Sequence, residues 1–182
     1  MDDGQPTDLT ERLQGAIVHF ARTEQGLVAF LREMLVSVLV VVAIGMLLFA
    51  VSGVWPPMVA VESGSMEPNL YRGDLVVVME EQRFAPEYAV GGTGVVPMDV
   101  GEDHHYVQFG GNGDVIVYKP YGNDQQTPVI HRAHFYVEKG ENWYDRADPA
   151  YVEADSCEEL RYCPAPYAGF ITKGDNDVSN DY

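Results

Sequence analysis

The chain has 182 residues with 11 basic and 28 acidic side chains, which give a formal net charge of −17. The acidic residues are spread along the sequence and no basic patch is present, so the composition excludes a nucleic-acid-binding function. Hydrophobic residues make up 46% of the chain, enough for a packed core. The acidity therefore indicates a folded, salt-adapted protein and not a disordered one.

The first 33 residues are predicted to contain an amphipathic helix. Between Asp8 and Arg32, apolar residues recur among polar ones at helical spacing, and Thr7 and Asp8 are suitable N-caps. We expect this helix to lie along the cytoplasmic surface of a membrane. Its apolar residues are Leu13, Ile17, Phe20, Leu27, Phe30 and Leu31.

Residues 34–54 are predicted to form one transmembrane helix. They contain no charged side chain, and about 20 apolar residues cross a hydrocarbon core of about 30 Å. A cleaved export signal is the alternative, but this run is longer than a signal core and no small-x-small pattern precedes Trp55. Arg22 and Arg32 precede the run and Arg72 is the first cation after it. The positive-inside rule therefore predicts a single-pass plasma-membrane protein with a cytoplasmic N-terminus.

Residues 55–182 are predicted to form one extracytoplasmic, mainly β domain. Their number suits a single modest core. Short β-branched or aromatic runs follow the turn pairs Gly73-Asp74 and Gly113-Asp114, whereas residues 84–112 are rich in Gly and Pro and predict long loops. The predicted strands are residues 75–79, 115–118, 129–137 and 169–172.

Residues 63–68, Ser-Gly-Ser-Met-Glu-Pro, place a candidate nucleophile shortly after the apolar run. A serine hydroxyl is a weak nucleophile until a base accepts its proton and a third group orients that base. Gly64 lets the backbone turn closely before Ser65, and Pro68 is a rigid residue suited to an exposed turn. The triplet alone is typical of a flexible loop, but its continuation into Arg-Gly-Asp-Leu at residues 72–75 is much rarer.

This stretch resembles the catalytic-serine box of type I signal peptidases, the membrane-bound serine proteases that remove signal peptides from exported proteins. Residues 129–133 resemble the general-base box of that family. They carry His131 where the usual bacterial enzymes have Lys, which matches the archaeal and endoplasmic-reticulum-type branch. Residues 171–177 resemble the third box, whose pattern places aspartates at Asp175 and Asp181. Together with the acidity, the resemblance suggests a haloarchaeal member with a LexA-like β fold.

The resemblance implies a role for each box. Ser65 would be the nucleophile, His131 the general base, and Asp181 the residue that orients the imidazole. Asp175 is the competing choice, or it holds the turn or supports the triad through Lys173 or a backbone contact. The Ser65 N–H and the Ser63 hydroxyl would stabilise the oxyanion. Shallow apolar pockets for small substrate residues would be lined by Met66, Leu75, Val76 and Val77.

The expected substrates are signal peptides of secretory preproteins at the bilayer surface, with the export translocon as a candidate partner. The reaction needs neither a metal nor a cofactor. Two other functions remain open: a LexA-like autoprotease, and an inactive membrane-tethered binding or assembly module. Closeness of Ser65 and His131 would favour the peptidase over the inactive module.

Several residues have a competing interpretation. His134 lies three positions after His131 and is expected on the opposite face of the strand. Residues 102–105, Glu-Asp-His-His, resemble a metal site by composition, but a solvated loop is the simpler interpretation. Lys119 and Lys173 could imitate a Ser-Lys dyad. Cys157 and Cys163 are either a local disulfide or two buried thiols.

Overall fold

The computed structural model describes residues 12, 14–15, 18, 26–123, 125–178 and 182. The chain separates into two compact units, Met1–Val51 and Ser52–Tyr182. Most of the amphipathic helix predicted over residues 8–32 lies outside the described residues, and its last part belongs to a longer helix.

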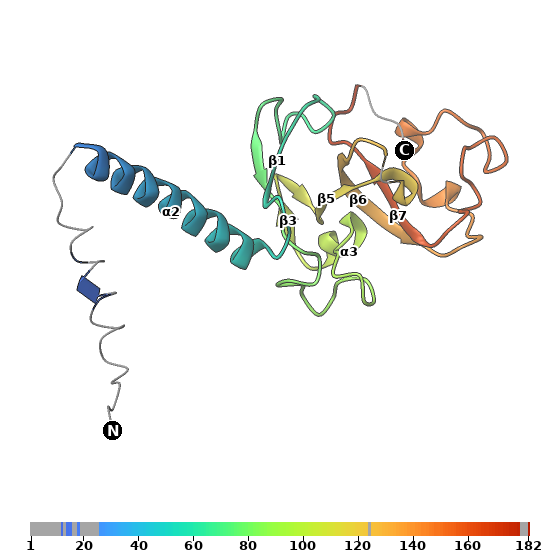
Figure 1. Cartoon of the computed structure of the whole chain (residues 1–182). Helices are drawn as coiled ribbons and strands as arrows, with labels where there is room; N and C mark the ends of the chain where they lie inside the picture. Colours follow the sequence, from blue (N-terminus) through green and yellow to red (C-terminus); the bar gives the residue numbers. More distant parts are fainter. Residues whose placement is uncertain (1–11, 13, 16–17, 19–25, 124, 179–181) are drawn as a thin grey trace. The chain divides into compact units, whose positions relative to one another are not determined.

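Helix α2 (Gly26–Ser52) contains all but the last two residues of the predicted transmembrane run (Figure 1). It has 27 residues, a mean hydropathy of 3.0, and no buried residue in its most apolar stretch. An apolar helix without a packing partner suits a lipid environment, and at 1.5 Å per residue it spans about 40 Å. The helix could therefore cross a membrane. It begins eight residues before the predicted span and ends at Ser52, two residues before the span's predicted end, and the φ of 79° at the following Gly53 suits a helix C-terminus.

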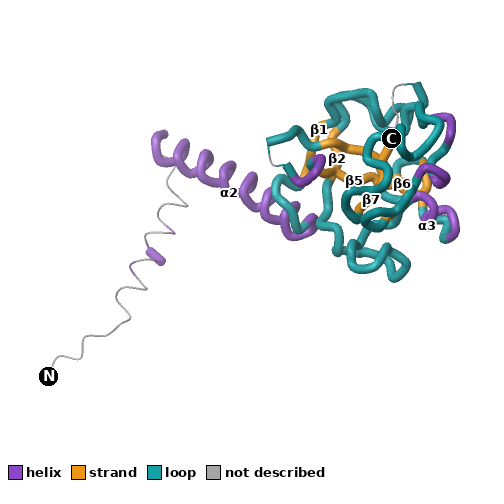
Figure 2. Tube along the Cα trace, turned by 90° about the vertical axis from the view of Figure 1, so that its right-hand side faces the viewer, coloured by secondary structure: helices purple, strands orange, loops and turns teal. Residues whose placement is uncertain are grey.

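The second unit is built from small antiparallel sheets (Figures 1 and 2). Strand β1 (Met58–Ala60) pairs with β2 (Leu75–Val77), and β3 (Val107–Gln108) pairs with β4 (Gly111–Asn112). Strands β5 (Val115–Tyr118), β6 (Val129–Val137) and β7 (Gly169–Lys173) form a sheet with β6 in the centre. A mainly β domain is thus present in the described residues.

The predicted strands over residues 115–118 and 129–137 are confirmed to the residue. The first predicted strand ends two residues early, at Val77, and the last runs one residue further, to Lys173. Residues 84–112 are not only loop: they contain α3 (Met98–Asp103) and the β3–β4 hairpin. The three 3-10 turns are Pro120–Gly122, Tyr144–Arg146 and Pro149–Tyr151.

Two hydrophobic clusters form the core of this unit. The first surrounds Trp143 and packs on the distal half of the three-stranded sheet. The second lies under the β1–β2 sheet and receives Val115 and Ile130 from β5 and β6. The second cluster buries Met66 of residues 63–68, here called the serine segment, and Leu70 just after it, so it anchors that segment to the sheet. The clusters consist of Phe135, Val137, Trp143, Ala147 and Ala165, and of Val61, Met66, Leu70 and Val76.

A disulfide joins Cys157 and Cys163. It closes a short loop in the segment that leads from the 3-10 turns to β7, and Cys157 is itself buried. Of the two interpretations that the sequence left open, the structure has the disulfide.

Candidate functional site

The serine segment consists of tight turns that are stabilised by backbone hydrogen bonds and by the buried side chain of Met66. Glu67 N–H donates to the Gly64 carbonyl, and Leu70 N–H donates to that of Met66. The Met66 side chain is fully buried and anchors the loop, whereas Ser63 is exposed and Ser65 is half-buried. The Ser63 and Ser65 hydroxyl oxygens are 3.2 Å apart and share a hydrogen bond. Burial of Met66 therefore presents both hydroxyls at the surface of the domain.

The turn after β7 binds directly to the serine segment. Asn176 N–H donates to the Ser65 carbonyl at 2.9 Å, and the Asn176 side-chain amide donates to the Gly64 carbonyl at 3.0 Å. A third bond runs from the Asn69 amide to Asp175 Oδ2 at 2.8 Å. Residues more than 100 positions apart in the sequence are thus held in register around the candidate nucleophile.

Asp175 also forms a buried ion pair with Arg132, the residue after His131. Arg132 Nε lies 2.8 Å from Oδ1 and Nη2 lies 2.6 Å from Oδ2, and the two side chains are only 3% and 8% exposed. A bidentate pair of this kind is strong and fixed in orientation. The contact ties the histidine segment to the turn that holds Ser65. Asp175 is thus fixed by Arg132 and Asn69, not by the Lys173 contact that was one sequence interpretation.

The far side of the Arg132 guanidinium lies against the β3–β4 hairpin. Nη1 donates to the carbonyls of Gln108 and Gly113 at 2.9 and 3.1 Å. A Cβ on Gly111 would be 2.8 Å from the guanidinium carbon, and one on Gly110 would be 2.5 Å from the Asn69 amide oxygen. Glycines at the hairpin turn therefore allow the backbone to approach close enough to satisfy the buried arginine.

His131 lies on β6 opposite Ile116 of β5. Side-chain alternation places it on the face that also carries Tyr118 and Thr172, whose hydroxyls are 2.6 Å apart, and on the opposite face from Arg132. Burial lowers the pKa of His131, the Lys173 ammonium lowers it further, and the Asp175 carboxylate opposes both. The described hydrogen bonds of Ser65 join its hydroxyl to that of Ser63 and its carbonyl to the Asn176 N–H. The imidazole is kept neutral and half-buried.

Lys173 is a buried cation that stabilises the turn after β7. Its ammonium donates to the Gly174 carbonyl at 2.8 Å and to the Asn176 carbonyl at 3.3 Å, and lies 3.9 Å from the centre of the Tyr151 ring. The Tyr151 hydroxyl in turn donates to Asp177 at 2.7 Å. Lys173, considered from the sequence as part of a Ser-Lys dyad, is therefore held by backbone carbonyls and an aromatic ring.

His134 belongs to the hydrophobic core. The pairing of β6 with β7 shifts register between Ala133 and Phe135, which leaves His134 as an extra residue. The His134 ring meets Tyr182 edge to face, and its Nδ1 lies 3.2 Å from the Tyr182 hydroxyl. Burial, aided by Lys173, lowers the pKa of His134 to about 4. It is a structural, neutral histidine at ordinary pH.

The remaining predicted site residues fall into three groups. Asp181, the favoured orienting residue, lies outside the described residues. Met66 and Val76 are buried in the core, whereas Leu75 and Val77 are exposed on β2, so only the latter two present apolar surface to a substrate in this structure. The predicted roles of all five stay predictions.

The loop at residues 102–105 shows no sign of a metal site. The His104 ring stacks on Tyr88 with centroids 4.1 Å apart. Across the described part of the chain, no group of three or more His, Cys, Asp or Glu side chains could hold an ion. The stacking of His104 gives this loop a packing role.

Sequence reasoning missed three residues that build the site: Asn69, Arg132 and Asn176. Arg132 and Asn176 stand next to His131 and Asp175 in the boxes, and that adjacency was the available signal. No sequence signal pointed to Asn69, because its bond to Asp175 depends on how the loop that carries Asn69 folds back toward the turn after β7.

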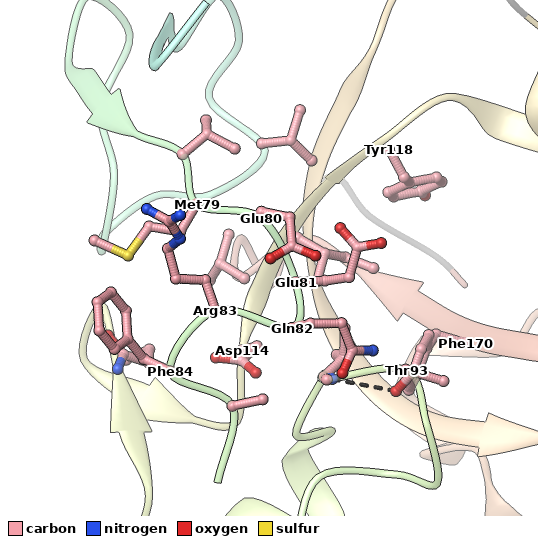
Figure 3. A pocket seen from close by; sticks show the side chains of 18 of the residues that line it. Met79, Glu80, Glu81, Gln82, Arg83, Phe84, Thr93, Asp114, Tyr118 and Phe170 are labelled. Atoms are coloured by element: carbon pink, nitrogen blue, oxygen red, sulfur yellow. Dashed lines mark hydrogen bonds between the residues drawn. The ribbon is translucent and has the colours of Figure 1, made fainter. Parts of the chain in front are cut away.

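A pocket lies beside β5 (Figure 3), and Ile130 of residues 129–133 is among the residues that line it. It is lined by residues 76–86 and 92–95 and by side chains of β5, and it contains neither Ser65 nor His131. Ser65 and His131 therefore lie outside the lining of this pocket.

Comparisons of the chain with protein families, with curated proteins and with solved structures found no match.

Proposed function

We propose that this protein is a membrane-bound serine endopeptidase that cleaves N-terminal signal peptides from exported preproteins after small residues. The observation that carries the proposal is the convergence of three separate segments. Asn176 is bonded to Ser65, and Asp175 is bonded to Arg132, the neighbour of His131. These are the segments whose residues resemble the three boxes of type I signal peptidases. A chance resemblance would not require them to meet.

Ser65 would attack the scissile carbonyl while His131 accepts its proton and then passes it to the leaving amine. Water would hydrolyse the acyl-enzyme, with the same imidazole as base. A general base must be unprotonated, and the lowered pKa of His131 favours that form. Catalytic hydrogen bonds are often long until substrate is bound. Formation of the Ser65–His131 bond on substrate binding is thus part of the proposal.

The oxyanion would be stabilised by the Ser65 N–H and the Ser63 hydroxyl. The bond of 3.2 Å between the two hydroxyls supports this, because it places the Ser63 donor next to the reacting atom. Loss of one such donor typically raises the barrier by about 3–4 kcal/mol. Ser63 would therefore matter for rate more than for binding.

The two aspartates would have different roles. Asp175 is already paired with Arg132 and Asn69, so its carboxylate positions the turn that holds Ser65. Asp181 stays the proposed partner of His131. This division follows from the bidentate geometry, which uses both oxygens of Asp175.

Membrane anchoring would supply part of the substrate orientation. A signal peptide places its apolar segment in the bilayer, and α2 is long and apolar enough to occupy the same bilayer. A shared anchor converts an encounter in solution into one confined to a surface. The cleavage site would then add as an extended strand beside the exposed residues Leu75 and Val77 of β2.

The proposal is tested by cleavage of a preprotein in vesicles that contain the full-length protein. We expect wild type to release a mature product with a new N-terminus after a small residue. Ser65→Ala should abolish the product, and Ser63→Ala should slow it by about 10²–10³-fold. Wild-type cleavage by Ser65→Ala would overturn the assignment.

The inactive binding module is the second candidate, and one observation favours it. Side-chain alternation on β6 points His131 to the face opposite Arg132, whereas Arg132 is the residue tied through Asp175 to Asn69 beside the serine segment, as a protein without catalysis would allow. The same assay separates the two functions, because a binding module yields no cleaved product with any variant. Retained preprotein binding without cleavage would identify the module.

A further inference from the structure

Two hydroxyl groups meet across the central strand of the three-stranded sheet. The Tyr118 hydroxyl, on β5, and the Thr172 hydroxyl, on β7, are 2.6 Å apart and share a hydrogen bond. Strand β6 lies between these two strands. The hydrogen bond therefore passes over one face of β6. We call the linked side chains of Tyr118 and Thr172 the hydroxyl bridge.

The strand register places the hydroxyl bridge over His131. Tyr118 is paired with Val129 of β6, and Thr172 is paired with Ala133. Successive side chains of a strand point to opposite faces, so His131 is the residue that lies between these two positions on the face of the bridge. The hydroxyl bridge thus crosses β6 at the level of the imidazole.

The hydroxyl bridge depends on hydrogen bonding and not on packing alone. A distance of 2.6 Å is at the short end of the range for a pair of hydroxyl oxygens. Both residues are half-buried, and buried hydroxyls are normally hydrogen-bonded. A phenylalanine and a valine would fill a similar space, but they would not join the tyrosine ring to the far strand. The two hydroxyls therefore fix the direction of the ring across the sheet.

The environment of His131 agrees with a cover of this kind. Burial is the largest cause of the lowered pKa of His131. On the same face of the sheet, Ile116 lies opposite His131 on β5, and Val129 precedes it by two residues on β6. These two side chains flank the imidazole, and the hydroxyl bridge extends over it. An enclosed side chain loses rotamer freedom.

The charged groups near His131 are not part of the hydroxyl bridge. Lys173, at the end of β7, and Asp175, in the turn that follows, both act on the pKa of His131. Glu80 and Glu81 line the pocket that the tyrosine of the bridge also borders. Removal of a bridge hydroxyl therefore leaves all four charges in place.

We propose that Tyr118 and Thr172 are positioning residues for His131: the hydroxyl bridge holds the imidazole in one orientation and shields it from water. This inference rests on the proposed function, in which His131 is the general base. A base accepts a proton only within a narrow geometry, and a small misplacement of a reacting group slows catalysis strongly. The hydroxyl bridge limits such misplacement.

The experiment follows the titration of the His131 ring by NMR in the full-length, histidine-labelled protein in detergent micelles. The signal is identified by its loss in His131→Gln. Thr172→Val removes one hydroxyl, Thr172→Ser keeps it, and Tyr118→Leu removes the ring. Tyr136→Leu is the matched control, because Tyr136 is also a half-buried aromatic residue of this sheet but packs edge to face on Phe170.

Loss of the hydroxyl bridge admits water to the imidazole. The pKa of His131 should therefore rise toward its ordinary value in Thr172→Val and rise further in Tyr118→Leu. Preprotein cleavage by these two variants should show a kcat lower by about 10–10²-fold with little change in KM. Thr172→Ser should restore the wild-type titration, and Tyr136→Leu should leave it unchanged.

An unmoved His131 titration in Thr172→Val and Tyr118→Leu would overturn the proposal, and so would an equal shift in Tyr136→Leu. A shifted titration with unchanged kcat would refute the positioning role. If Tyr118→Leu does not fold, Thr172→Val decides alone. The titration needs no cleavage, so a shift in a protein that cleaves no preprotein would contradict the proposed function and leave the bridge over His131 in place.

Discussion

Replacement of Asp175 by Asn should destabilise the β domain by about 3 kcal/mol. Removal of one partner from a buried ion pair costs about 3–5 kcal/mol, because the other charge is left buried without compensation. Arg132 and Asp175 have side chains only 3% and 8% exposed, so solvent cannot replace the lost partner. The carbonyls of Gln108 and Gly113 still accept hydrogen bonds from Arg132 in the variant, so the loss of stability should lie at the lower end of that range.

Thermal unfolding followed by circular dichroism measures this effect. For a domain of this size, 1 kcal/mol corresponds to about 3–6 °C, so the midpoint should fall by about 10–15 °C. A buried pair is little screened by salt, and the difference should persist from low to molar salt. Arg132→Met combined with Asp175→Asn should be less destabilising than the sum of the two single changes.

The alternative role of Asp175 gives a different pattern. If this carboxylate oriented the imidazole, Asp175→Asn would reduce kcat by about 10⁴-fold with no change in the midpoint. An unchanged midpoint together with such a loss would refute the positioning role assigned here. Asp181→Asn is the matched variant, and it should lower kcat without lowering the midpoint.

Three further predictions concern protonation and the disulfide. Since burial and Lys173 both lower the pKa of His131, the rate should fall at a lower pH than an ordinary histidine would give, and Lys173→Met should move this acid limb to higher pH; an unmoved limb would contradict the coupling. At His134 the unfolded chain takes up a proton near pH 6.5 and the folded chain near pH 4, so stability should fall by roughly 2–3 kcal/mol as pH drops through this window. His134→Gln should weaken this dependence of stability on pH, as measured by denaturant titrations at several pH values. An unaltered dependence would assign the pH effect to other groups. Cys157→Ser with Cys163→Ser should cost about 2 kcal/mol, as expected for a short closed loop, and equal stability of the oxidised and doubly substituted proteins would contradict this.

Local patterns predicted the regular elements of the fold well. Strands β5 and β6 were predicted to the residue, because each is a β-branched or aromatic run bounded by turn residues. The apolar helix followed from its lack of charge. The small hairpin β3–β4 and the helix α3 were missed, because glycine-rich segments carry no clear period, and the hairpin carbonyls bind an arginine distant in the sequence.

For the candidate site, the sequence supplied candidate residues but not their geometry. The sequence placed Ser65, His131 and Asp175 in three boxes, yet it offered two roles for Asp175. Only the fold shows that both of its oxygens are used by Arg132 and Asn69. Likewise, the burial of Met66 and Val76 follows from the second core cluster, which forms between strands distant in sequence.

The most direct test of the account is a double-substitution cycle on Ser65 and His131, measured as the rate of preprotein cleavage in vesicles. If the imidazole activates the hydroxyl, the two residues act as a unit and their effects are strongly non-additive. Ser65→Ala, His131→Ala and the double variant should then retain the same small residual rate. Wild-type activity of His131→Ala, or losses that multiply in the double variant, would contradict the proposed catalytic pair.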